Sequence, residues 1–80
     1  MLRISKQTRL KPVQILEQAA NYFGKDGLGL EEKEQNPCCV HFEGAGGYIS
    51  INIVDEDKHR DVEVESREWD YQAKRFLEKI

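Results

Sequence analysis

The sequence lacks the features that mark secreted and membrane-bound proteins. Among its 80 residues there are only two cysteines, and because these are adjacent they cannot form the disulfide framework of a small secreted domain. No apolar run approaches the roughly 20 residues of a membrane span. No charged segment followed by an apolar one opens the chain as a secretory signal would. We therefore expect a cytoplasmic protein with no membrane partner.

Linkers and repeats are missing too. The one glycine-rich stretch, residues 44–47, is too short for a linker and lies between two strand-like segments. No repeat with a period of about 20–50 residues is present. Hydrophobic residues make up 39% of the chain and charged residues 34%, which is typical of a folded, soluble domain. The sequence thus predicts a single domain over residues 1–80.

Charge is distributed unevenly. The net charge is −3, yet residues 1–11 carry four basic residues and no acid, whereas residues 12–80 hold 8 basic and 15 acidic residues. Opposite charges on neighbouring strands attract, so we expect the basic first strand to lie beside acidic ones. A nucleic-acid-binding surface would need more positive charge with aromatic side chains interleaved, so we expect no nucleic-acid partner.

Hydrophobic periodicity predicts both kinds of secondary structure. It indicates strands over residues 2–10, 28–35, 38–43, 48–54 and 61–65, and helices over residues 12–23 and 68–80. The acid-rich strand over 28–35 is expected at a sheet edge, where charge discourages unwanted pairing. Ser66 is a plausible cap for the last helix. The order β-α-β-β-β-β-α predicts an α+β fold of two layers, an antiparallel sheet with helices on one face.

The segments over 38–43 and 48–54 predict their own register. If residues 44–47 form the turn of a hairpin, the apolar residues of one strand meet the apolar residues of the next, and a slip of one residue would destroy this match. A third strand continues the pattern. The resulting pairs are Phe42 with Ile49, Val40 with Ile51, Cys38 with Ile53, Val62 with Ile53, and Val64 with Ile51.

The same register brings polar side chains together on the outer face of the sheet. His41 lies opposite Ser50, and Ser50 lies opposite Glu65. A catalytic triad needs histidine between the nucleophile and the acid, whereas here serine is in the middle, on a face open to water. We therefore expect no catalytic residue in this row.

The cysteines and histidines do not predict a metal or another cofactor. Cys39 and His41 share a face, but a structural zinc site needs four ligands. Cys38 points to the opposite face because neighbouring strand residues alternate. We expect Cys38 to be a small apolar core residue, and the two cysteines to be reduced and separate.

Two functions remain, and they differ in class. The order of elements resembles a shortened helix-grip fold, the START-like group of lipid-binding proteins and polyketide cyclases, which encloses a ligand between its sheet and its C-terminal helix. The first function is a non-catalytic binding or interaction module that forms a homodimer or another homo-oligomer, since a thin core gains stability by association.

The alternative is a small-molecule binder or enzyme with a cleft for a small apolar ligand beside the last helix, walled by Trp69, Tyr71, Phe76 and Tyr48. A filled core would favour the first, and a cavity of about 300 Å³ or more the second.

Overall fold

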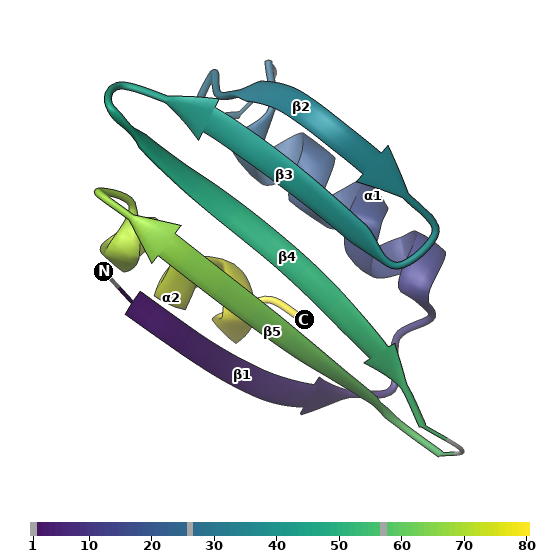
Figure 1. Ribbon diagram of the computed structural model, residues 1–80. Helices are drawn as coiled ribbons and strands as arrows, with labels where there is room; N and C mark the ends of the chain where they lie inside the picture. The colour runs from purple at the N-terminus through teal and green to yellow at the C-terminus, as the bar shows by residue number, and fades with distance from the viewer. Residues whose placement is uncertain (1, 26, 57) are drawn as a thin grey trace.

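The computed structural model describes residues 2–25, 27–56 and 58–80. One sheet of antiparallel strands carries both helices on the same side (Figure 1). The predicted α+β class and element order are confirmed. The elements are β1 (Leu2–Thr8), α1 (Pro12–Phe23), β2 (Glu31–Asn36), β3 (Cys39–Gly44), β4 (Gly47–Asp55), β5 (Arg60–Arg67) and α2 (Asp70–Glu78). Within the described residues, no helix has the length and apolar character needed to cross a membrane.

The first strand of the chain pairs with the last, and the strand order across the sheet is β1-β5-β4-β3-β2. The predicted edge position of the acid-rich strand is confirmed, because β2 pairs only with β3 and is exposed along its length. This strand begins at Glu31, later than predicted. The residues before it form a loop whose backbone is bonded back to the end of α1, with the N–H of Leu30 donating to the carbonyl of Phe23 at 2.8 Å.

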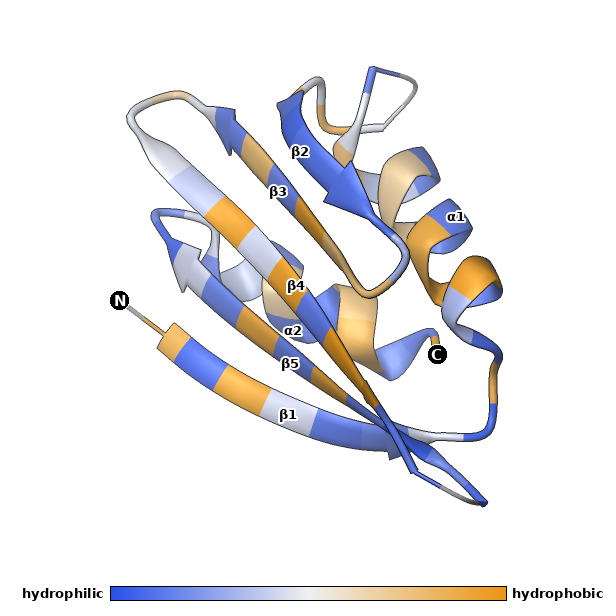
Figure 2. Ribbon diagram, turned by 45° about the vertical axis from the view of Figure 1, so that its right-hand side comes forward, coloured by the Kyte–Doolittle hydropathy of each residue, from blue (hydrophilic) through white to orange (hydrophobic). Residues whose placement is uncertain are grey.

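The predicted register of the central strands is confirmed. Val40 pairs with Ile51, and Ile51 pairs with Val64. At the hairpin, Ala45 and Gly46 have φ angles of 51° and 80°, as in the type I′ turn that suits the twist of two-residue hairpins. Apolar and polar residues alternate along β4 and β5, whereas β2 is almost wholly hydrophilic (Figure 2).

The apolar side of the sheet forms one core with both helices. Phe23 of α1 lies at its centre, with its ring centroid 5.7 Å from that of Phe42 in β3 and 5.2 Å from that of Phe76 in α2. Side chains from both layers fill this space: Ile15, Ala19, Phe23, Val40, Phe42, Ile49, Ile51, Val62, Val64, Ala73 and Phe76 are all at most 3% exposed.

The start of α2 differs from the prediction. The helix begins at Asp70 and is preceded at the N-cap position by Trp69, which makes no side-chain cap. Ser66 is not a cap, because it belongs to β5 and its side chain is fully buried on the core side of the sheet. The Nε1–H of Trp69 instead donates to the carbonyl of Gly44 at 3.0 Å and ties the start of α2 to the β3–β4 turn.

Lys6 breaks the apolar pattern of β1 for a reason that the structure shows. Its ammonium group donates to the carbonyl of Leu77 at 2.7 Å. Carbonyls in the last turn of a helix lack partners within the helix, and they lie at the negative end of its dipole. A core-side lysine on β1 therefore stabilises the C-terminal end of α2.

The charge of β1 is also balanced as expected. This strand lies beside β5, and the guanidinium of Arg3 is 2.9 Å from the carboxylate of Glu65. The predicted attraction between the basic strand and its acidic neighbour is thus confirmed for this pair.

The prediction for Cys38 is wrong. Pro37 and Cys38 form a tight turn between β2 and β3, which removes Cys38 from the strand alternation and leaves it exposed. Asn36 stabilises this turn, since its side-chain oxygen accepts the N–H of Cys38 at 3.1 Å. The two cysteines are not separate either, because Cys38 and Cys39 are joined by a disulfide.

We expect Ile51→Ala to lower the free energy of unfolding by about 2–5 kcal/mol, because this 1%-exposed side chain sits in the central apolar row. Chemical denaturation monitored by circular dichroism measures the change. Val54→Ala on the same strand is the control, since Val54 is 39% exposed and its truncation should cost within about 0.5 kcal/mol. Equal losses in the two variants would contradict the described core.

Candidate functional site

The face of the sheet opposite the helices is uncovered and polar. One row of side chains crosses all strands in the order Arg3, Glu65, Ser50, His41 and Glu34. A second row beside it runs Ser5, Glu63, Asn52, Cys39 and Asn36. The predicted outer-face residues, His41, Ser50, Glu65 and Cys39, are therefore neighbours on one surface.

His41 is the most closely engaged residue of this face. Its Nδ1 lies 2.5 Å from the hydroxyl of Ser50, and its ring stacks on Tyr48 with 5.5 Å between the centroids. The other ring nitrogen, Nε2, lies 3.7 Å from a carboxylate oxygen of Glu43. The sequence prediction placed serine between His41 and Glu65 and missed Glu43. This carboxylate could have been found, because residues two apart on a strand share a face.

Histidine thus lies between a hydroxyl and a carboxylate, but the arrangement lacks the other parts of an acyl-transfer site. A separation of 3.7 Å is too long for the hydrogen bond that orients a catalytic histidine. Ser50 lies on β4, which pairs with strands on both sides. The backbone N–H groups beside Ser50 are therefore engaged in hydrogen bonds to the neighbouring strands. An oxyanion needs such donors unengaged. His41, Ser50 and Glu43 therefore do not have the geometry of an acyl-transfer triad.

Glu65 organises the neighbouring part of the face. One of its carboxylate oxygens accepts the hydroxyl of Tyr48 at 3.0 Å, and the other accepts from Arg3 at 2.9 Å. The hydrogen bond to Glu65 is the main reason that the pKa of Tyr48 is raised above its ordinary value of 10.0; burial and the negative charge of Glu65 act in the same direction. The phenol therefore stays protonated and donates to Glu65.

Asn52 links the second row. Its side-chain oxygen lies 2.8 Å from the sulfur of Cys39, and its amide nitrogen lies 3.5 Å from a carboxylate oxygen of Glu63. In the disulfide the sulfur carries no hydrogen, so the first is a sulfur–oxygen contact. Only after reduction can Cys39 donate a hydrogen bond to this oxygen.

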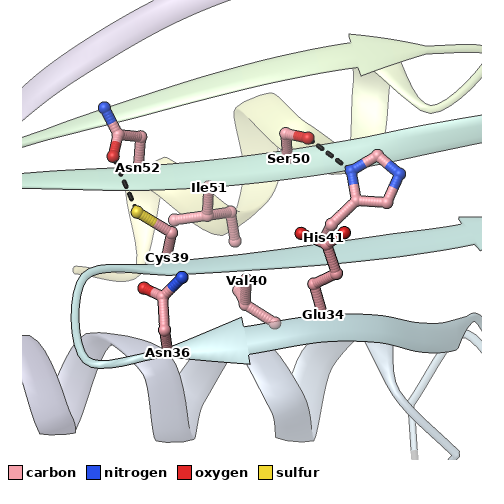
Figure 3. Close-up of a pocket in the computed structure, with 8 residues that line it drawn as sticks. All are labelled: Glu34, Asn36, Cys39, Val40, His41, Ser50, Ile51 and Asn52. Atoms are coloured by element: carbon pink, nitrogen blue, oxygen red, sulfur yellow. Dashed lines mark hydrogen bonds between the residues drawn. The ribbon is translucent and has the colours of Figure 1, made fainter.

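A hollow of about 350 Å³ lies on this face over β3 and its neighbours (Figure 3). Its lining is Glu34, Asn36, Cys39, Val40, His41, Ser50, Ile51 and Asn52, and contains neither lysine nor arginine. A smaller hollow of about 170 Å³ shares Ser50 and Asn52 with it. It adds Glu63, Val64 and Glu65 from β5 and Arg3 from β1, whose guanidinium is paired with Glu65. Oxygen acceptors are therefore concentrated around the outward side chains of β4.

The four residues predicted to wall an apolar cleft are not brought together. Phe76 is 1% exposed within the filled core, and Tyr71 is 68% exposed. Trp69 is hydrogen-bonded to the β3–β4 turn, while Tyr48 lies on the uncovered face with His41. A hollow of about 830 Å³ that the sequence did not suggest lies elsewhere, between the start of α1 and the β2–β3 turn, where it is lined by Val13 and Pro37 among others.

Replacing Glu65 with Gln should lower the pKa of Tyr48 toward 10.0, because the hydrogen bond to the carboxylate is replaced by a weaker one and the negative charge beside the phenol is removed. Because this pKa is raised in the folded protein, the stability that the Tyr48–Glu65 bond contributes is present below the ordinary pKa and is lost as pH rises through the pKa of Tyr48. Absorbance titration at alkaline pH measures the pKa of Tyr48. The Tyr48→Phe variant identifies which part of the tyrosine absorbance change comes from Tyr48. Glu63→Gln is the control, and an equal change there would refute the assignment to Glu65.

Ser50 should not react with a fluorophosphonate probe, because its backbone surroundings offer no oxyanion donors. The mass of the intact protein after incubation with the probe shows whether Ser50 is labelled. In a separate assay, His41→Ala, Ser50→Ala and Glu65→Ala should each stay folded. None of these changes should abolish any turnover of ester, phosphate or thioester substrates. Labelling of Ser50 that His41→Ala abolishes in a folded protein would show that the site is catalytic after all.

Among the described residues, no group of three or more histidine, cysteine, aspartate or glutamate side chains is placed to hold a metal ion. No protein family, curated protein or solved structure matches this chain. The resemblance to helix-grip proteins accordingly stays a prediction.

Proposed function

We propose that this protein is a non-catalytic interaction module that holds a cationic side chain of a protein partner on the uncovered face of its sheet. The observation that carries the proposal is the lining of the hollow over β3, which combines the carboxylate of Glu34 with side-chain oxygens and contains no lysine or arginine.

The chemistry of the lining matches an ammonium or guanidinium group. Such groups have hydrogen-bond donors and no acceptor. Glu34 offers two carboxylate oxygens. Asn52 and Ser50 line the hollow from β4, with their side-chain oxygens directed toward Cys39 and His41 (Figure 3). Charge-assisted hydrogen bonds of this kind are stronger than neutral ones.

The charge of the wider face supports the same partner. Carboxylates outnumber cations on the outward positions: Glu31, Glu34, Glu43, Asp61, Glu63 and Glu65 against Arg3 and Arg67, with Lys33 at the β2 bulge lying 3.3 Å from Glu31. One of the two arginines is already paired with Glu65. A basic partner is therefore attracted to this face from a distance, with a strength that falls as salt is added.

Several side chains of the face are also ordered before any partner arrives. Glu65 is held by Tyr48 and Arg3, and Ser50 is held by His41. Side chains that are already in place lose less conformational entropy when a ligand binds. Because these side chains are already held in place, a partner can bind without a rearrangement of the sheet backbone.

A second copy docked face to face is less favoured than a basic partner. A two-fold axis would bring the same acidic surface of both copies together, and like charges across an interface repel. Self-association through another surface is compatible with the proposal. The alternative, a cleft beside α2, is disfavoured because Phe76 and Ala73 fill the space between that helix and the sheet.

The test is a titration of the full chain with a short lysine-rich peptide, followed by NMR at several salt concentrations. We expect amide shifts at Glu34, Cys39, His41, Ser50 and Asn52 and weaker binding at higher salt. The same peptide with acetylated lysines is the control, and it should not bind. Shifts confined to the helices, or equal binding of the acetylated peptide, would overturn the proposal.

Two charge-matched variants sharpen this test. Glu34→Gln removes the carboxylate of the hollow and should weaken binding by about 2–5-fold, as for one exposed ion pair. Glu17→Gln removes an exposed carboxylate from α1, in the opposite layer, and should leave binding unchanged. Sedimentation of the free protein at several concentrations checks for dimers, and a dimer that buries the hollow would contradict the proposed partner.

A further inference from the structure

The cysteine pair lies where a solvent-borne thiol can reach it. Cys38 occupies the exposed turn between β2 and β3, and Cys39, the first residue of β3, is half-buried at the edge of the hollow. The two are joined by a disulfide. Neither sulfur is enclosed by the core, which lies on the other face of the sheet.

Each sulfur faces a hydrogen-bond acceptor. Oδ1 of Asn36 lies 3.0 Å from the sulfur of Cys38, and Oδ1 of Asn52 lies 2.8 Å from the sulfur of Cys39. A disulfide sulfur has no hydrogen to donate, whereas a thiol does. The amide oxygens are therefore already in position to accept the thiol hydrogens of the reduced pair.

The fold around the pair has support that does not involve the disulfide. The turn is held by the N–H of Cys38, which donates to Asn36 at 3.1 Å, and by the carbonyl of Cys38, which accepts from the N–H of Ile53 at 2.9 Å. A link between adjacent residues also closes almost no loop, so it removes little entropy from the unfolded chain. We therefore expect the sheet and its core to stay folded when the link is broken.

We propose that Cys38 and Cys39 form a reversible thiol–disulfide site that a dithiol reductant opens and an oxidising disulfide closes. The thiolate of the reductant attacks the exposed sulfur of Cys38, the sulfur–sulfur bond breaks, and Cys39 leaves as a thiolate that takes up a proton. The second thiol of the reductant, as its thiolate, then attacks the mixed disulfide and releases Cys38, which is protonated in turn. Two electrons and two protons pass from the dithiol to the cysteine pair, and the reductant leaves as a disulfide.

The experiment uses the full chain, purified in air, and dithiothreitol without denaturant. Mass spectrometry after alkylation should show no free thiol before reduction and two after it, with the original state restored by oxidised glutathione. NMR should show chemical-shift changes confined to residues 36–39 and the residues that they contact, including Asn52. In both redox states the amide resonances should keep the chemical-shift dispersion of a folded protein. Cys39→Ser is the control, and it should carry one thiol that reductant does not alter.

A second variant tests the role of the acceptor. Asn52→Ala removes the oxygen that accepts from the thiol of Cys39, and it should shift the equilibrium in a redox buffer about 2–10-fold toward the disulfide, as expected for one lost hydrogen bond. Asn21→Ala, on the exposed side of α1, should leave the equilibrium unchanged.

Four results would overturn the proposal. They are two free thiols that oxidised glutathione does not join, thiols that appear only in denaturant, loss of the folded NMR spectrum on reduction, and a disulfide between two chains on a non-reducing gel.

Discussion

The pairing of β4 with β3 and β5 determines both the core and the uncovered face. Val40, Ile51 and Val64 form an apolar row across these three strands and point toward the helices. Because successive strand residues point to opposite faces, the register that buries this row also places His41 beside Ser50 on the other side. A one-residue slip would exchange the two sets. The hydrophobic packing on one side of the sheet therefore determines the geometry of the uncovered face on the other side.

Much of this arrangement could be predicted, because alternation and turn length are local properties of the sequence. The four-residue turn over 44–47 and the isoleucines of β4 were enough to predict the register and to place His41 opposite Ser50. The sequence was less informative where one residue leaves the alternation. In the sequence, Cys38 continues the apolar alternation of the strand that follows. The preceding Asn36 and Pro37 favour a turn, however, and this turn determines where the side chain of Cys38 points.

Contacts within one face were also harder to predict than the face itself. Glu43 and Glu65 are both on the same side of the sheet as His41, and only the positions of their side chains show that Glu43 is the carboxylate next to the ring. Likewise, the sequence suggested Phe76 as a wall of a ligand cleft, whereas the structure buries this side chain in the core. A pattern of residues indicates direction, whereas a cavity depends on the volumes of all its neighbours.

The pairing of β1 with β5 has a consequence for how the domain opens. Arg3 and Glu65, which meet across these strands, are 62 residues apart in the chain, so this contact closes a long loop, whereas the β3–β4 hairpin closes a short one. Lys6 further ties β1 to the last turn of α2. Detaching β1 removes a bond from α2, and releasing α2 exposes the inner side of β1. The two ends of the chain therefore depend on each other, and α2 also shares the core with α1 through the contact of Phe76 with Phe23.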